Sequence, residues 1–88
     1  MISKKVTLKK VGLNARPAAL FVKEANKFSS NIYLECKGKK VNGKSIIGVI
    51  LLGAFGGEEL TIYANGIDEK KAVEALADLL ENRMENCS

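Results

Sequence analysis

GLNARPAALFV, residues 12–22, has the pattern of a loop that leads directly into a helix. The apolar spacing of a buried helix face begins at Ala18 and predicts a helix over about residues 15–28. Arg16 lies beside the helix start, a suitable position for handling a negatively charged group. Its neighbour Asn14 presents a neutral amide, which cannot act as a nucleophile. The buried face of this helix comprises Ala18, Phe21, Val22, Ala25 and Phe28.

Strand patterns lie on both sides of this helix. Residues 2–8, 32–36 and 60–64 alternate in polarity, which predicts strands with one face toward water. Gly38 indicates a hairpin turn into a short strand near residues 40–41. The residues that share one face of the three longer strands are Ile2, Lys4, Val6 and Leu8, then Ile32, Leu34 and Cys36, then Leu60, Ile62 and Ala64.

Two further helices complete the expected fold. Ser45 precedes a brief apolar helix, and Asp68 is expected to cap a last helix with a buried stripe from Ala72 to Leu80. The order is βαββαβα, so we predict an α+β fold in which one helical layer covers one face of an antiparallel sheet. No linker, repeat or low-complexity segment interrupts the pattern, and residues 1–88 are expected to form one domain.

The composition of the chain argues against several classes of site and of protein. The chain has 88 residues, a net charge of +4 and no histidine, and its two cysteines form no CxxC pair. A disulfide framework, a zinc site and other metal sites are therefore not expected, and no cofactor is indicated. No signal peptide is evident, and the most apolar stretch, residues 46–55, is too short to span a bilayer. We expect a soluble cytoplasmic protein without a membrane association.

Enzymatic and nucleic-acid motifs are weak or missing. Residues 53–56 match the GxxG clamp of KH domains, but they lead toward a strand rather than a helix. A nucleic-acid-binding sheet needs exposed aromatic residues, and Tyr33 and Tyr63 are the only candidates. The sequence contains no Walker loop, paired carboxylates or Ser-His constellation. We expect neither direct nucleic-acid binding nor enzymatic activity.

Ser45 has two interpretations. Its position after Gly43-Lys44 and before an apolar run is that of a helix N-cap, and caps are more common than functional serines. A phosphate on this side chain would lie at the positive end of a helix dipole and would add about two negative charges without breaking the helix.

The helix after Ser45 is apolar on nearly every side. A helix on a sheet buries one stripe, so inward-pointing Val49 and Leu52 would leave other apolar residues near the surface. Either the loop over residues 53–57 covers them or they form a partner-binding patch. Ala19 and Leu20, off the buried stripe of the first helix, would extend such a patch beside Arg16. The residues left near the surface are Ile46, Ile47 and Ile50.

Two motifs together resemble a known family. GLNARPAALFV resembles the active-site loop of HPr, the small phosphocarrier of the bacterial sugar phosphotransferase system, whose usual form is GLHARPA. KKVNGKSIIGVILLGAFGGEEL resembles the family's second landmark, a regulatory serine and the helix that it starts. The likeness runs from the first strand to the last helix. It implies an open-faced β-sandwich, a four-stranded antiparallel sheet with three helices on one side.

The resemblance also implies a chemistry. In HPr the loop histidine accepts a phosphoryl group from Enzyme I and passes it to Enzyme II components, and the arginine found here as Arg16 helps to hold that group. The serine that falls on Ser45 is phosphorylated in Gram-positive bacteria by HPr kinase/phosphorylase. The phosphoserine form then acts as corepressor for a catabolite control transcription regulator.

The sequence departs from the family pattern at Asn14, which stands where the histidine should be. Phosphoryl transfer needs a nucleophilic imidazole nitrogen, and an amide does not supply one. The pattern is similar to the Crh-like (catabolite-repression HPr) variants, which lack this histidine. By that analogy, phosphorylated Ser45 and the patch of Ile46, Ile47 and Ile50 would dock the regulator. The contact would be extended by Asn14, Arg16, Ala19 and Leu20.

Two other functions stay open at this point. Asn14 is, in one alternative, a substitution within a true phosphocarrier HPr. In the other, an HPr-fold protein serves another pathway without the phosphate switch, because folds host many functions. Enzyme I and Enzyme II components would be contacted through the fold alone in a protein without the histidine.

Overall fold

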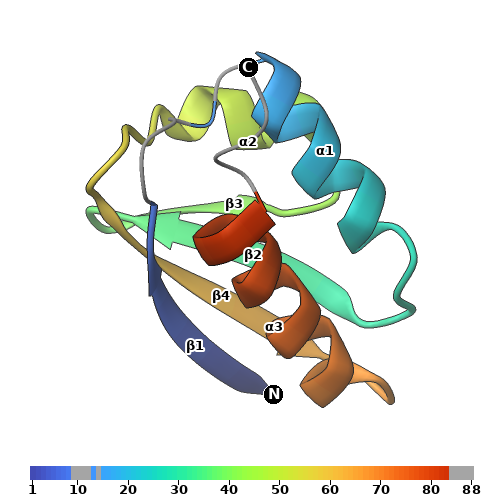
Figure 1. The fold of residues 1–88 in the computed structure, drawn as a ribbon. Helices are drawn as coiled ribbons and strands as arrows, with labels where there is room; N and C mark the ends of the chain where they lie inside the picture. Colours follow the sequence, from blue (N-terminus) through green and yellow to red (C-terminus); the bar gives the residue numbers. More distant parts are fainter. Residues whose placement is uncertain (9–12, 14, 84–88) are drawn as a thin grey trace.

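The computed structural model describes residues 1–8, 13 and 15–83 of the chain. Over this range a sheet carries helices on one face and leaves its other face open (Figure 1). The βαββαβα order and the α+β, open-faced arrangement confirm the predicted fold class. The elements are β1 Ile2–Thr7, α1 Ala15–Ala25, β2 Asn31–Cys36, β3 Lys39–Asn42, α2 Ile46–Leu52, β4 Glu59–Asn65 and α3 Glu69–Asp78, followed by a π-helical turn over Leu79–Arg83.

The sheet has the strand order β1-β4-β2-β3, and all neighbouring strands are antiparallel. The last strand in the chain therefore lies between the first and the second. Two residues connect β2 to β3, namely Lys37 and Gly38, with φ values of 52° and 80°. Two consecutive positive φ values are typical of a type I′ turn, whose twist matches that of the strands. This geometry confirms the hairpin turn predicted at Gly38.

The core lies between the sheet and the helices. Alternate strand residues face it, as the sequence pattern predicts, and burial of each large apolar side chain stabilises the fold by about 1.5–3 kcal/mol. Cys36 is 6% exposed, which agrees with its position on the same strand face as Ile32 and Leu34. Lys4 lies opposite Ile62 but is exposed, because β1 is an edge strand and its long side chain reaches water. The core includes Val6, Leu8, Phe21, Ile32, Leu34, Val49, Leu60, Ile62, Leu76, Leu79 and Leu80.

The open face of the sheet carries an aromatic and charged cluster. Tyr33 and Tyr63 are paired across β2 and β4. The Lys40 ammonium lies 4.2 Å from the Tyr63 ring centroid and 5.2 Å from that of Tyr33, which are cation–π distances. The Tyr63 hydroxyl donates to Glu35 Oε1 at 2.6 Å, and this hydrogen bond raises the pKa of Tyr63. The two tyrosines therefore have partners within the sheet itself.

Helix α1 ends earlier than predicted. The sequence pattern places its end near residue 28, but α1 ends at Ala25, and the last α-helical hydrogen bond is donated by the Asn26 N–H to Val22 O. The next two turns are tighter, because the Lys27 N–H donates to Glu24 O and the Phe28 N–H donates to Ala25 O. Phe28 still packs against the core. The buried stripe therefore continues one turn beyond the α-helix.

Asp68 occupies the position before α3, but it is not the predicted side-chain cap. Its carboxylate instead accepts hydrogen bonds from the N–H groups of Ser29 and Ser30 and from the Ser30 hydroxyl, at 2.5–3.0 Å. These hydrogen bonds, that of the Ser30 side chain first, lower the pKa of Asp68 to about 2. A Cβ on Gly66 would lie 2.6 Å from the Ser30 Cα, so only glycine allows this close approach. Asp68 thus fastens the α1–β2 loop to the start of α3.

Candidate functional site

Ser45 is the N-cap of α2, as predicted. Its backbone is extended (φ −106°, ψ 116°), and its Oγ accepts a hydrogen bond from the Gly48 N–H at 3.1 Å. The preceding loop is held by the Asn42 side chain, which accepts from the Lys44 N–H at 2.9 Å. A Cβ on Gly43 would lie 2.7 Å from Ile32 Cγ2, so the loop requires glycine there to approach β2. The sequence NGKS therefore fixes the Ser45 hydroxyl at a half-buried position at the helix start.

Lys44 connects this loop to the end of α1. Its ammonium donates to the Phe28 carbonyl oxygen at 2.7 Å. A lysine that binds a carbonyl group in the turn after a helix stabilises that end of the helix. The lysine adjacent to Ser45 therefore contributes to the packing of the loop against the turn after α1.

The outer side of α2 is an exposed apolar surface. Val49 and Leu52 point into the core, as expected from their spacing, and are 0% and 7% exposed. Ile47 and Leu51 are each 67% exposed, so the loop that follows α2 does not cover the helix. We call the exposed residues the α2 surface, and they are Ile46, Ile47, Ile50, Leu51 and Phe55.

Sequence reasoning missed two members of the α2 surface. Leu51 was available from helical spacing, because a residue two positions after Val49 points away from the core side. Phe55 lies beyond the helix and is 69% exposed. Its position depends on the backbone after the C-cap Gly53, whose φ of 67° is in the left-handed region. No pattern in the sequence gives that direction.

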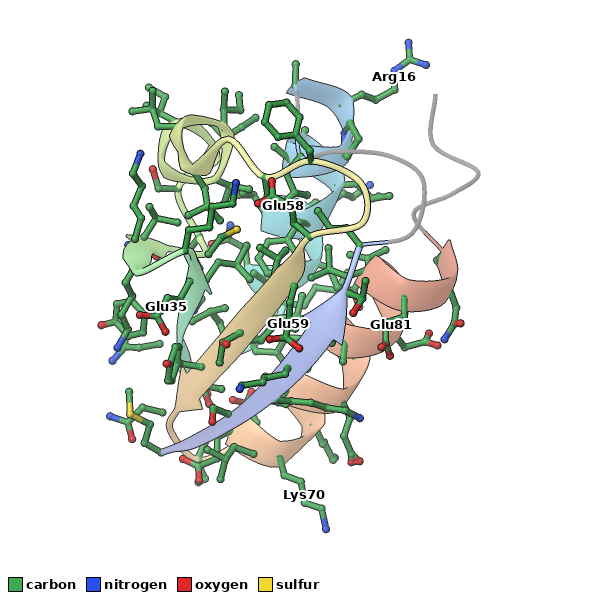
Figure 2. The ribbon with its side chains drawn as sticks, turned by 90° about the vertical axis from the view of Figure 1, so that its left-hand side faces the viewer. Arg16, Glu35, Glu58, Glu59, Lys70 and Glu81 are labelled. Atoms are coloured by element: carbon green, nitrogen blue, oxygen red, sulfur yellow. The ribbon has the colours of Figure 1, made fainter. Side chains whose placement is uncertain are left out.

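Helix α1 lies beside α2 and brings a second group of predicted residues to the same end of the molecule (Figure 1). Ala19 is exposed, whereas Leu20 is only partly exposed and packs against the core. The expectation of a surface position for Leu20 is therefore only partly met. Figure 2 shows Arg16 at the start of α1 with its side chain directed outward. Asn14 lies outside the described residues.

Leu13, before α1, is joined to the segment after α2. The Leu13 N–H donates to the Ala54 carbonyl oxygen at 3.0 Å, and both side chains are buried. The start of α1, the α2 surface and the turn after it thus belong to one end of the fold. Across the ranges 1–8, 13 and 15–83, no helix has the length and apolar character required to cross a membrane.

The family model and the similar proteins found by comparison agree with one another. Residues 2–82 match the family model described as PTS HPr component phosphorylation site. The chain is 49% identical over 85 residues to the HPr-like protein Crh of Bacillus subtilis, which covers 96% of this chain and 100% of that protein. It is 51% identical over 82 residues to the HPr-like protein Crh of Halalkalibacterium halodurans, covering 92% and 98% of the two chains.

Solved structures agree with these sequence matches. A crystal structure of HPr-C-His from Thermoanaerobacter tengcongensis superimposes with a TM-score of 0.91 at 48% identity, covering 97% of each chain. A crystal structure of Bacillus subtilis Crh, described as a swapped dimer, gives a TM-score of 0.75 at 52% identity and covers 91% of this chain and 93% of that one.

Proposed function

The chain belongs to the HPr family of the phosphotransferase system, and from this premise we propose that it is a regulatory, non-enzymatic member of carbon catabolite repression. In this proposal residues 1–88 form one domain that HPr kinase/phosphorylase phosphorylates on Ser45 in the cytoplasm. The phosphorylated protein then binds a catabolite control transcription regulator as its corepressor. Histidine phosphotransfer is not part of this function.

The observation that carries the proposal is the continuity of the α2 surface with Ser45. Five exposed apolar residues follow the serine within ten positions, and Ile47 and Leu51 are each 67% exposed. Apolar residues gathered on one surface mark interaction sites more often than single exposed ones do. A modifiable hydroxyl at the edge of such a surface would allow a charge change to control binding there.

Phosphorylation of Ser45 would alter recognition more than folding. The hydroxyl receives one hydrogen bond, from the Gly48 N–H, within its own turn. A phosphoryl group there would add about two negative charges near the positive end of α2, where anions are tolerated. It would offer oxygens to arginine or lysine side chains of the regulator, while Ile46, Ile47 and Ile50 supply apolar contact area. We assign to Arg16, Ala19 and Leu20 the edge of the same contact.

The absence of histidine supports a regulator over a phosphocarrier. The chain contains no imidazole, and Asn14 stands at the position that carries it in GLHARPA. A carrier needs a nitrogen that both attacks the phosphoryl donor and releases the group to the next acceptor. The amide nitrogen does neither, because its lone pair is delocalised into the carbonyl.

The first test is phosphorylation by HPr kinase and ATP, followed by location of the phosphate by mass spectrometry. We expect one phosphoryl group, on Ser45, and none in Ser45→Ala. An unmodified Ser45, in an assay where ordinary HPr is modified, would contradict the proposed switch and favour an HPr-fold protein of another pathway.

A second test concerns the phosphocarrier alternative. We expect no transfer of phosphate from phosphoenolpyruvate through Enzyme I, with ordinary HPr as the positive control. Stable transfer to this chain would show that the carrier function does not require the histidine and would refute the role given to Asn14. Binding to the regulator is measured separately, with the unphosphorylated and the Ser45-phosphorylated protein compared by calorimetry.

A further inference from the structure

The turn after α2 is closed by two reciprocal hydrogen bonds between its end residues. The Glu58 N–H donates to the Phe55 carbonyl oxygen at 3.1 Å, and the Phe55 N–H donates to Glu58 Oε1 at 2.7 Å. Gly57, between them, has a φ of 92°, a conformation that glycine adopts without strain. Backbone and side chain of Glu58 therefore both hold the residue that carries the exposed phenyl ring.

Glu58 also fastens this turn to the sheet. The Leu8 N–H donates to the Glu58 carbonyl oxygen at 3.0 Å, and the Gly57 N–H donates to the Leu8 carbonyl oxygen at 2.7 Å. The second carboxylate oxygen of Glu58 lies 2.9 Å from Lys37 Nζ and accepts from the Cys36 thiol at 3.5 Å. One side chain thus joins the turn to the β2–β3 hairpin. Figure 2 shows Glu58 inside the bend of this loop.

The carboxylate is well placed to stay charged. Its side chain is 16% exposed, and the hydrogen bond from Lys37, followed by that from the Phe55 N–H, lowers the pKa of Glu58. Hydrogen bonds to an ionised group are shorter and stronger than those between neutral groups. The turn is accordingly held by a charge-assisted contact rather than by neutral hydrogen bonds alone.

This arrangement fixes the backbone on both sides of an exposed aromatic residue. Ala54 is buried and accepts the Leu13 N–H, while Phe55 is 69% exposed. An exposed side chain on an anchored backbone loses less conformational freedom when a partner binds it. Aromatic residues held in this way are typical binding anchors. The Phe55 ring lies outside the core and therefore does not contribute to core packing.

We propose that Glu58 is a positioning residue for partner docking, which holds Phe55 beside the α2 helix so that the ring forms part of the contact with the regulator. The inference rests on the proposed function, since it assigns a residue to the same docking surface. Glu58 acts through Phe55 and makes no contact with the partner itself. It therefore differs from Ser45, whose phosphoryl group would bind the partner directly.

The test is a double-mutant cycle on the Ser45-phosphorylated protein, with a purified catabolite control regulator as the probe. Glu58→Ala should weaken binding by about threefold to tenfold, as expected for a contact that has lost its preorganisation. In a Phe55→Ala background the same change should have no further effect, because the positioned ring is already missing. Equal losses in both backgrounds, or no loss in Glu58→Ala, would overturn the proposal.

Amide hydrogen exchange separates positioning from general destabilisation. In Glu58→Ala the protection of the Phe55 amide should fall, while that of Ile62 in the middle of β4 stays unchanged. Glu58→Gln keeps an acceptor oxygen but loses the charge, so Phe55 protection and affinity should both lie between those of Glu58→Ala and of the unaltered protein. Weakened binding with unchanged Phe55 protection would refute the role of Glu58.

The neighbouring Glu59 provides the matched control. It is exposed and lies over the sheet (Figure 2), so Glu59→Gln should change neither binding nor exchange. An equal loss of affinity in Glu59→Gln and Glu58→Ala would show that the effect comes from the change in net charge, which would overturn the role of Glu58. Failure of the unaltered phosphorylated protein to bind would instead overturn the docking function itself. Binding by that protein with an unaffected Glu58→Ala overturns only the role of Glu58.

Discussion

Helices α2 and α3 pack on the same face of the sheet but distribute their apolar residues differently. α3 buries Ala72, Val73, Leu76 and Ala77, and its exposed positions are polar, namely Lys70, Lys71, Glu74 and Asp78. α2 buries only Val49 and Leu52 and exposes apolar residues on its remaining sides. The outer side of α3 is polar, as expected for a surface in contact with water. The outer side of α2 is apolar but exposed, so it contributes little to the stability of the fold. The difference supports the proposal that the exposed residues of α2 bind a partner.

The residues at the starts of α3 and α2 also differ in the range of their hydrogen bonds. Asp68 ties the start of α3 to Ser29 and Ser30, nearly forty positions earlier in the chain. Ser45 closes the start of α2 within a single turn. The first arrangement is a long-range tertiary contact, whereas the second is local and leaves the Ser45 side chain half-buried at the helix start.

The largest expected effect on stability is in α3. Leu76→Ala removes a fully buried side chain and should lower the free energy of unfolding by about 2–5 kcal/mol, measured by urea denaturation. Exposed Glu74→Ala on the same helix is the control and should change stability by less than about 0.5 kcal/mol. A small loss in Leu76→Ala would mean that α3 is not the stabilising helix of the pair.

Acid should weaken the attachment of α3. The pKa of Asp68 is about 2 in the folded protein, below its ordinary value of 3.8, so its stabilising contribution is fully present above about pH 4. That contribution is lost as the pH falls toward 2, because the unfolded chain takes up the proton first. Urea midpoints measured from pH 5 to pH 2 should fall more steeply for the unaltered protein than for Asp68→Asn. Parallel curves would contradict this role of the carboxylate.

Much of this comparison was accessible from the sequence, because it depends on local patterns. Alternation located the strands, helical spacing selected Val49 and Leu52 as inward, and position identified Ser45 as the cap. The role of Asp68 could not be predicted correctly, because its carboxylate accepts hydrogen bonds from residues far away in the chain and none from its own helix. An aspartate can serve either as a helix N-cap or as the acceptor of long-range hydrogen bonds, and only the packed structure distinguishes these two roles.

The candidate site was predicted in part for the same reason. Ile46, Ile47 and Ile50 followed from spacing, whereas Phe55 depends on the left-handed Gly53 and the turn that follows. Leu20 was expected at the surface, but it packs against the core and is only partly exposed. Tertiary packing, which no single segment encodes, decides both positions.

Removing the cap of α2 should have a moderate effect. Ser45→Ala eliminates the hydrogen bond from the Gly48 N–H and should lower the free energy of unfolding by about 1 kcal/mol. Ser45→Asp keeps an acceptor at the N-cap and should stay close to the unaltered protein. Thermal or urea unfolding distinguishes the two, and equal losses would indicate that the hydroxyl, rather than the cap acceptor, matters.

The smallest effect on stability is expected on the α2 surface itself. Ile47→Ala should change the free energy of unfolding by less than about 0.5 kcal/mol, because Ile47 is 67% exposed. Binding of the Ser45-phosphorylated protein to the regulator should weaken by about 1–2 kcal/mol, measured by calorimetry. Lys71→Ala on α3 should affect neither quantity. A loss of stability without a loss of binding would reverse the assignment of the two helices.

The tyrosine pair on the open face gives the protein a built-in optical probe. The chain has no tryptophan, and both of its tyrosines belong to the cluster with Lys40 and Glu35, on the side of the sheet opposite the helices. Its intrinsic fluorescence therefore reports the integrity of the sheet and does not respond directly to a partner bound at α2. A change in the emission of a tryptophan-containing partner would then measure docking without interference from this chain.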